Sequence, residues 1–116
     1  MLIRTDPASE QPLFAQVAGS IRSDVALGVL RAGDRLPAAR DVASALGINL
    51  HTVLRAYQDL RDEGLVDMRR GRGAVVTDAA TSLATLREDV RALVARAHSI
   101  GLSPSSLASL IKEMNP

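Results

Sequence analysis

Residues 38–64 read AARDVASALGINLHTVLRAYQDLRDEG, and this stretch decides the fold. Apolar residues at helical spacing lie on both sides of Gly47, a residue that can end a helix in the left-handed conformation. Asn49 follows as a good N-cap for a second helix. The spacing predicts a short helix over 38–46 and a longer helix over 50–63, closed by Gly64. Their expected inward-facing residues are Val42, Ala43, Leu46, Val53, Ala56, Tyr57 and Leu60.

Two helices that meet across a tight turn form a helix-turn-helix. The second helix can enter the major groove of DNA because its outer face is not needed for the core. In helix 50–63 that outer face carries polar side chains, which can hydrogen-bond phosphates and base edges. The polar residues on or near it are Asn49, His51, Thr52, Arg55 and Gln58. The pattern therefore favours a DNA-reading helix.

Upstream of this pair, the sequence predicts one more helix and a connector. After Pro12, which suits a first helical turn, apolar residues recur at helical spacing until Gly28 stops them. They are Leu13, Phe14, Val17, Ile21 and Val25. Segment 28–37 holds two glycines and a proline, which is typical of a connector that contains a short extended piece.

Downstream of Gly64, two short strand-like runs at 65–68 and 74–77 predict a β-hairpin. Its loop contains Arg69, Arg70, Gly71 and Arg72. Glycine lets the loop backbone approach phosphates, while arginines supply charge or enter the minor groove. Alone, such a loop is more often a solvated turn. Because it follows a helix-turn-helix, we interpret it as a DNA-binding wing.

The last third of the chain predicts a helical hairpin. Residues 78–80 resemble a linker, Thr81 or Ser82 can cap a fourth helix, and Ser103-Pro104 opens a fifth helix after Gly101. The apolar stripe of the fourth helix is close to heptad spacing, which favours a subunit interface over an amphipathic cover for the first domain. The expected dimerisation residues are Leu83, Leu86, Val90, Leu93, Val94, Leu107, Leu110 and Ile111. We thus expect a winged helix-turn-helix domain over 1–78 and a two-helix dimerisation tail over 79–116.

Composition supports a mainly α fold and argues against an enzyme. Only 2% of the residues are aromatic, so a core of aliphatic side chains on packed helices is expected. The chain has no cysteine, and His51 and His98 lack neighbours at ligand spacing, which leaves no nucleophile with a base, no metal site and no cofactor site. The first residues do not form a signal peptide and no stretch suits a bilayer, so a cytoplasmic protein without membrane contact is expected.

Taken together in order and spacing, several short stretches make residues 10–77 similar to the GntR-type DNA-binding domain. The stretches are Pro12-Leu13-Phe14, Gln16-Val17, Gly28-Val29-Leu30, Gly33-Asp34-Arg35-Leu36-Pro37, Arg40-Asp41-Val42-Ala43, Thr52-Val53, Arg55-Ala56-Tyr57, Gly64-Leu65-Val66 and Arg70-Gly71-Arg72-Gly73. The resemblance is closest to the short YtrA-like branch, which has a compact pair of tail helices in place of a large effector domain. It implies a bacterial regulator.

The resemblance also implies which residues contact DNA. The positions of Arg40, Asn49, His51 and Thr52 are the usual contacts, and Gly71 lies at the minor groove. Leu50 occupies a position where proline or arginine is usual, and Ala38 one where serine often contacts a phosphate. Arg40 has a structural alternative, an ion pair with Asp41, Asp59 or Asp62. The expected DNA-binding set is Arg40, Asn49, Leu50, His51, Thr52, Arg55, Arg69, Arg70, Gly71 and Arg72.

These expectations combine into a repressor-like regulator that binds a palindromic operator as a homodimer. Two recognition helices related by a twofold axis predict half-site centres ~10 bp apart or a multiple of that spacing. By resemblance the target is a transporter operon or a similar local gene, and a small-molecule effector, where one acts, binds near the tail. The alternative is a winged-helix module that binds protein, against which the placement of basic residues argues.

Overall fold

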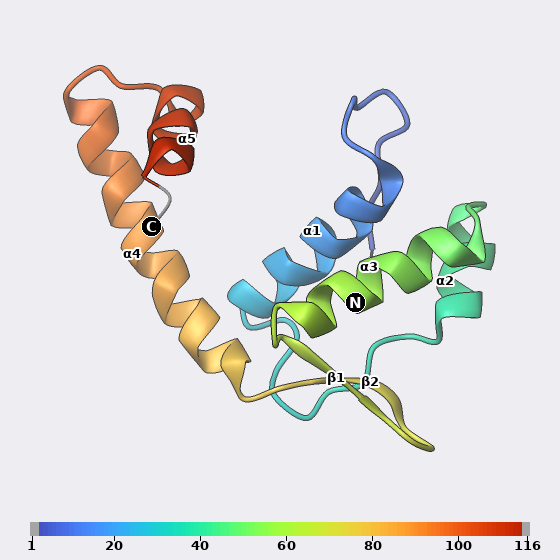
Figure 1. Cartoon of the computed structure of the whole chain (residues 1–116). Helices are drawn as coiled ribbons and strands as arrows, with labels where there is room; N and C mark the ends of the chain where they lie inside the picture. The colour runs from blue at the N-terminus through green and yellow to red at the C-terminus, as the bar shows by residue number, and fades with distance from the viewer. Residues whose placement is uncertain (1–2, 115–116) are drawn as a thin grey trace. The chain divides into compact units, whose positions relative to one another are not determined.

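The computed structural model describes residues 3–114, in which five helices and one β-hairpin follow one another (Figure 1). The elements are α1 (Leu13–Ala26), α2 (Ala39–Leu46), α3 (Leu50–Asp62), β1 (Val66–Arg69), β2 (Gly73–Val76), α4 (Ala79–Ser99) and α5 (Pro104–Glu113). This confirms the predicted mainly helical fold with a small hairpin. The chain forms two compact units, Met1–Ala84 and Thr85–Pro116.

The turn between α2 and α3 has the predicted chemistry. Gly47 caps α2 with φ 66°, a left-handed conformation that side chains other than glycine rarely adopt. The Ile48 N–H donates to the Ala43 carbonyl at 3.0 Å and so closes the cap. Asn49 then caps α3, because its Oδ1 accepts from the His51 N–H at 2.8 Å. These local hydrogen bonds end α2 and begin α3 within a tight turn.

In the first unit, α3 packs against α1, α2 and β1, and Figure 1 shows α1 and α3 side by side. The four residues of α3 that were predicted to face inward are all buried. Tyr57 is 3% exposed, and its hydroxyl donates to the Pro37 carbonyl at 2.7 Å, which fastens the connector to α3. The largest fully buried side chains are aliphatic: Ile21, Leu60, Val17, Val25, Val53, Val66, Val75 and Val76.

The hairpin is antiparallel, with Val66 opposite Val76 and Arg69 opposite Gly73. The connector adds an extended segment beside β2, where the Leu36 N–H donates to the Ala74 carbonyl and the Val76 N–H to the Asp34 carbonyl, both at 2.8 Å. The extended piece predicted in segment 28–37 is thus present and supports the hairpin along one edge.

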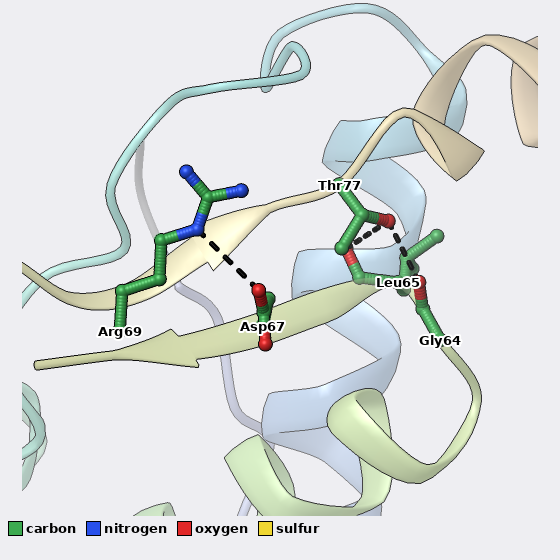
Figure 2. A network of polar contacts seen from close by, with 5 residues as sticks. All are labelled: Gly64, Leu65, Asp67, Arg69 and Thr77. Carbon is green, nitrogen blue, oxygen red and sulfur yellow. Dashed lines mark hydrogen bonds and ion pairs between the residues drawn. The ribbon is translucent and has the colours of Figure 1, made fainter.

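Thr77 fastens the base of the hairpin to the end of α3 (Figure 2). Its Oγ1 donates to the Gly64 carbonyl at 2.7 Å, with the Leu65 carbonyl 3.2 Å away, and its N–H donates to the Leu65 carbonyl at 3.0 Å. These bonds hold the end of the hairpin against the residues that follow α3.

The sequence was wrong about the start of α4. The helix begins at Ala79 rather than after a linker, so neither Thr81 nor Ser82 caps it. Thr77 replaces that cap, because its Oγ1 accepts from the Ala79 N–H at 3.3 Å. Ala80 is buried, and Ala79 and Leu83 pack against the core of the first unit. Helix α4 therefore starts in the first unit and continues into the second.

The second unit consists of the rest of α4 and of α5. Ser103 caps α5, accepting from the Ser106 N–H at 3.1 Å, and Pro104 occupies the first turn, as predicted. Of residues 85–114, only Ala97 and Leu107 are buried. Large apolar side chains remain exposed: Leu86, Val90, Leu93, Ile100, Leu110, Ile111 and Met114. None of the helices described is long and apolar enough to cross a membrane.

Candidate nucleic-acid interface

The outer face of α3 is polar and open. His51, Arg55 and Gln58 recur on one side of the helix and are exposed, while Thr52 beside them is half-buried. Asn49 is exposed as well, but its Oδ1 is already used in the cap, so its amide NH2 group is the part left for a ligand. The structure thus places the polar residues predicted on α3 along one side of the helix, from its N-cap to its third turn.

Leu50 lies differently from the other predicted contacts. Its side chain is half-buried and packs against the core of the first unit. It also has no group that could hydrogen-bond a base or a phosphate. Leu50 therefore holds the beginning of α3 against the core, and the polar residues on either side of it remain at the surface.

Arg40 is exposed in the first turn of α2. The structural alternative, an ion pair with Asp41, Asp59 or Asp62, is absent from the described residues, since no carboxylate there lies within ion-pair distance of Arg40. Asp62 instead contacts Arg61, with 3.6 Å between Nη2 and Oδ1. The guanidinium of Arg40 thus keeps its charge available to solvent or to a ligand.

The hairpin loop presents its predicted residues together. Arg69, Arg70, Gly71 and Arg72 are all exposed, and the Arg72 N–H donates to the Arg69 carbonyl at 3.0 Å across the turn. Gly71 has φ 79°, which requires glycine although a Cβ there would meet nothing within 4 Å. Arg69 also contacts Asp67, with 3.4 Å between Nε and Oδ2 (Figure 2). Arg70 and Arg72 therefore carry the less compensated charge.

Arg35 also lies at the hairpin loop, although the sequence analysis did not place it there. Its Nε donates to the Arg72 carbonyl at 2.9 Å, which brings a fourth guanidinium to the hairpin loop. This bond joins positions 37 residues apart. In the sequence, only the alternation of polar Arg35 with apolar Leu36 could have indicated a strand that pairs there.

Phe14 makes a contact with α3 that the sequence analysis also missed. The guanidinium Cζ of Arg55 lies 3.6 Å from the centre of the Phe14 ring, a cation–π contact between α1 and the outer face of α3. The ring is half-buried and Arg55 is exposed. The sequence assigned Phe14 only to the apolar pattern of a helix, because periodicity within one helix says nothing about a partner on another.

Groups suited to metal or acid–base chemistry do not gather within the described part of the chain. Residues 3–114 contain no cluster of three or more His, Cys, Asp or Glu side chains that could hold a metal ion. Burial raises the pKa of Tyr57 to about 12, so its hydroxyl stays protonated and acts as a structural donor. What the surface does offer is exposed arginines and amide and imidazole groups, which suit an anionic polymer with readable edges.

A family model described as "Bacterial regulatory proteins, gntR family" matches residues 13–76, more than half of the chain. The chain belongs to the GntR family. It is 29% identical to the HTH-type transcriptional repressor YtrA of Bacillus subtilis, over 98% of this chain and 92% of that protein. It is 32% identical to the HTH-type transcriptional regulator Rv1152 of Mycobacterium tuberculosis, over 89% and 85% of the two chains.

Solved structures agree with this assignment. YtrA from Sulfolobus acidocaldarius, a GntR-family transcription factor, matches with 35% identity and a TM-score of 0.64, over 85% of this chain and 99% of its own. The DNA-binding domain of AraR in complex with operator ORX1 matches with 29% identity and a TM-score of 0.57, over 64% and 92%. The GntR chain described here is accordingly a winged-helix, DNA-binding transcriptional regulator with a YtrA-like architecture.

Proposed function

We propose that this GntR-family regulator binds an inverted-repeat operator as a homodimer and represses transcription there. The observation that carries the proposal is the surface around α3: its outer face, Arg40 and the hairpin loop are all exposed, and the basic groups are mostly without carboxylate partners in residues 3–114. The repressor role is proposed because the Bacillus relative, a repressor by name, matches nearly the whole chain.

In the proposed complex, the first turns of α3 enter the major groove, where His51, Thr52 and the Asn49 amide meet base edges. Arg40 and Arg55 bind phosphates beside the groove. The hairpin is the wing, and its loop arginines follow the backbone or the minor groove, with Gly71 allowing close approach. Leu50 does not contact DNA in this arrangement, since it packs against the core.

The second unit supplies the proposed dimer contact. On α4, residues 86, 90 and 93 follow a heptad pattern and stay exposed within one chain, between 40% and 53% of their surface. Leu110 and Ile111 of α5 are exposed as well, whereas Leu107 is buried inside its own unit and Leu83 packs against the first unit. We propose that a second copy of this chain covers these exposed apolar residues, Leu86, Val90, Leu93, Leu110 and Ile111.

A twofold dimer predicts an operator with two inverted half-sites whose centres lie ~10 bp apart or a multiple of that distance. A small-molecule effector, where one acts, would bind at the tail and change the spacing of the two α3 helices. Sequencing the DNA fragments that the purified protein selects from a random pool tests the symmetry directly. Direct repeats or unrelated single sites among the selected fragments would contradict the proposal.

Replacing Arg40 with alanine tests the DNA contact itself. The guanidinium is exposed and has no carboxylate partner among residues 3–114, so its loss removes a phosphate contact without a large effect on folding. We expect affinity for the selected duplex to fall by about 1–3 kcal/mol. Fluorescence anisotropy at two salt concentrations measures it, because affinity also becomes less steeply dependent on salt when a phosphate contact is lost.

Arg61→Ala is the matched control for Arg40→Ala. It removes the same charge from an exposed arginine in the last turn of α3, away from the first turns. We expect the affinity of this control to stay within about twofold, since its exposed ion pair with Asp62 contributes little. Equal losses for both variants would show a general charge effect, and no DNA binding by the wild-type protein would favour the protein-binding alternative.

Replacing Arg35 with alanine tests whether the hairpin loop must be held in place. The variant loses the bond from Nε to the Arg72 carbonyl, so the loop arginines become less ordered before binding. We expect operator affinity to fall about three- to tenfold, as one hydrogen bond involving a charged donor is lost. The thermal unfolding midpoint should hardly change, because Arg35 is exposed. Unchanged affinity would show that the loop is ordered without Arg35.

A further inference from the structure

Two arginine contacts join the same region of the fold, and they use the guanidinium in opposite ways. Arg22 of α1 forms a two-pronged contact with Glu63 at the end of α3, with its Nε 3.0 Å and its Nη2 2.8 Å from the two carboxylate oxygens. Arg55 of α3 instead lies over the ring of Phe14 on α1, 3.6 Å from its centre. In the first contact, Arg22 donates two N–H bonds and pairs its charge with a carboxylate. In the second, the planar face of the Arg55 guanidinium lies on the ring, and the ring accepts no N–H bond from its edge.

The donors of a guanidinium lie in its plane and point outward from its edge. A ring beneath the face therefore restrains the group and leaves its N–H donors free, while the positive charge is not cancelled. Arg55 is exposed, and within residues 3–114 no carboxylate lies at ion-pair distance from it. The arrangement is one in which an arginine is held in place without being neutralised.

We infer that Phe14 is a positioning residue for DNA binding: its ring holds Arg55 ready to bind a phosphate of the DNA backbone beside α3. The role rests on the proposed function. Phe14 itself contacts no DNA in this arrangement. Because a free arginine must lose side-chain freedom when it binds, an arginine already restrained by a ring loses less, and binding is stronger for the same hydrogen bonds.

The position of the ring favours a phosphate over a base as the partner. Phe14 is on α1, so although Arg55 shares the outer side of α3 with His51 and Gln58, the contact draws its guanidinium toward α1. A groove-bound helix meets base edges with its outermost residues and the sugar–phosphate backbone at its sides. Arg55 should therefore add affinity for any sequence and not discriminate between sequences.

The test compares four variants with the wild-type protein by fluorescence anisotropy: Phe14→Leu, Phe14→Tyr, Arg55→Gln and the double variant Phe14→Leu with Arg55→Gln. Each is titrated with a selected duplex and with a duplex of random sequence, over a series of salt concentrations. Leucine keeps an apolar side chain but removes the ring face, tyrosine keeps the face, and glutamine removes the charge.

We expect Arg55→Gln to weaken binding to both duplexes by about 5- to 30-fold and to lower the salt slope by about one. Phe14→Leu should weaken both by about two- to fivefold, the range for an exposed cation–π contact, and Phe14→Tyr should bind like the wild type. In the Arg55→Gln background, Phe14→Leu should have no further effect, since the ring then has no guanidinium to position.

Three results would overturn the role of Phe14. They are wild-type affinity in Phe14→Leu, equal losses from Phe14→Leu with and without Arg55, and losses confined to the selected duplex. Arg55→Lys tests the same idea without touching α1, in case Phe14→Leu is poorly folded by circular dichroism. Lysine keeps the charge and the salt slope, but its ammonium has no planar face that can stack on the Phe14 ring, so binding should weaken about threefold. Wild-type affinity in Arg55→Lys would also contradict the role of Phe14. Wild-type protein that binds no duplex would instead overturn the proposed function.

Discussion

Replacing Leu93 with glutamate is expected to make the regulator monomeric and to lower its affinity for a two-half-site operator by about 100-fold or more. Leu93 is 40% exposed within one chain and follows the exposed Leu86 and Val90 along the heptad pattern of α4. A carboxylate at the centre of a subunit contact would lose its water without gaining a partner. The loss in DNA affinity follows because each half-site would then be bound independently.

Ala92→Glu is the matched control for Leu93→Glu. Ala92 is exposed and adjacent on the same helix, but it lies outside the heptad positions, so the same charge is introduced away from the proposed contact. Sedimentation equilibrium measures the subunit association, and anisotropy titration of a full operator and of a single half-site measures binding. A dimeric Leu93→Glu protein, or a monomer that binds the full operator as tightly as the wild type, would contradict the dimer proposal.

The helix-turn-helix could be predicted because its chemistry is local. A left-handed glycine at 47, an N-cap side chain at 49 and the spacing of Val53, Ala56 and Leu60 each act within a few residues, and the structure confirms all of them. The wing was predictable for the same reason, since its glycines and short strands are neighbours in the chain. Expected elements and observed elements therefore agree most closely from 39 to 76.

The start of α4 could not be predicted in this way. Residues 78–80 are small or polar and resemble a linker, but Ala80 is buried against a core formed by residues far away in the sequence. The packing of Ala79 and Ala80 against that core extends the helix back to Ala79. The same reason applies to Leu83, which fits the heptad pattern by spacing although it packs against the first unit.

The contacts that complete the candidate interface are also long-range. The Arg35 bond to the loop and the Phe14 contact with Arg55 each join residues about 40 positions apart, between elements whose faces are set by packing. Residue type alone gave no hint, since both arginines fit exposed positions equally well without partners. The sequence could therefore suggest candidate DNA contacts, whereas the structure adds which residues touch those candidates from other elements.

Tyr57 should make the protein lose stability in alkali. Burial raises the pKa of Tyr57 from 10.0 to about 12 in the folded chain. Below pH 10 the hydroxyl is protonated in both the folded and the unfolded state, so its full contribution is present. Between pH 10 and 12 the unfolded state loses the proton first and is favoured. We expect the free energy of unfolding to fall by about 2–3 kcal/mol across that range, because each tenfold difference in proton affinity between the two states corresponds to about 1.4 kcal/mol.

The measurement is unusually clean because the chain has one tyrosine and no tryptophan. Tyrosinate absorbance therefore titrates Tyr57 alone, and urea unfolding at about pH 8 and about pH 11 gives the matching change in stability. Tyr57→Phe separates this group from all others that titrate in alkali. It removes the donor to the Pro37 carbonyl, so it should cost about 1–2 kcal/mol at neutral pH, yet it should lose less stability than the wild type between the two pH values. Identical alkaline losses in both proteins, or a tyrosinate titration centred near 10 in the folded chain, would mean that the hydroxyl reaches water and does not fasten the connector to α3.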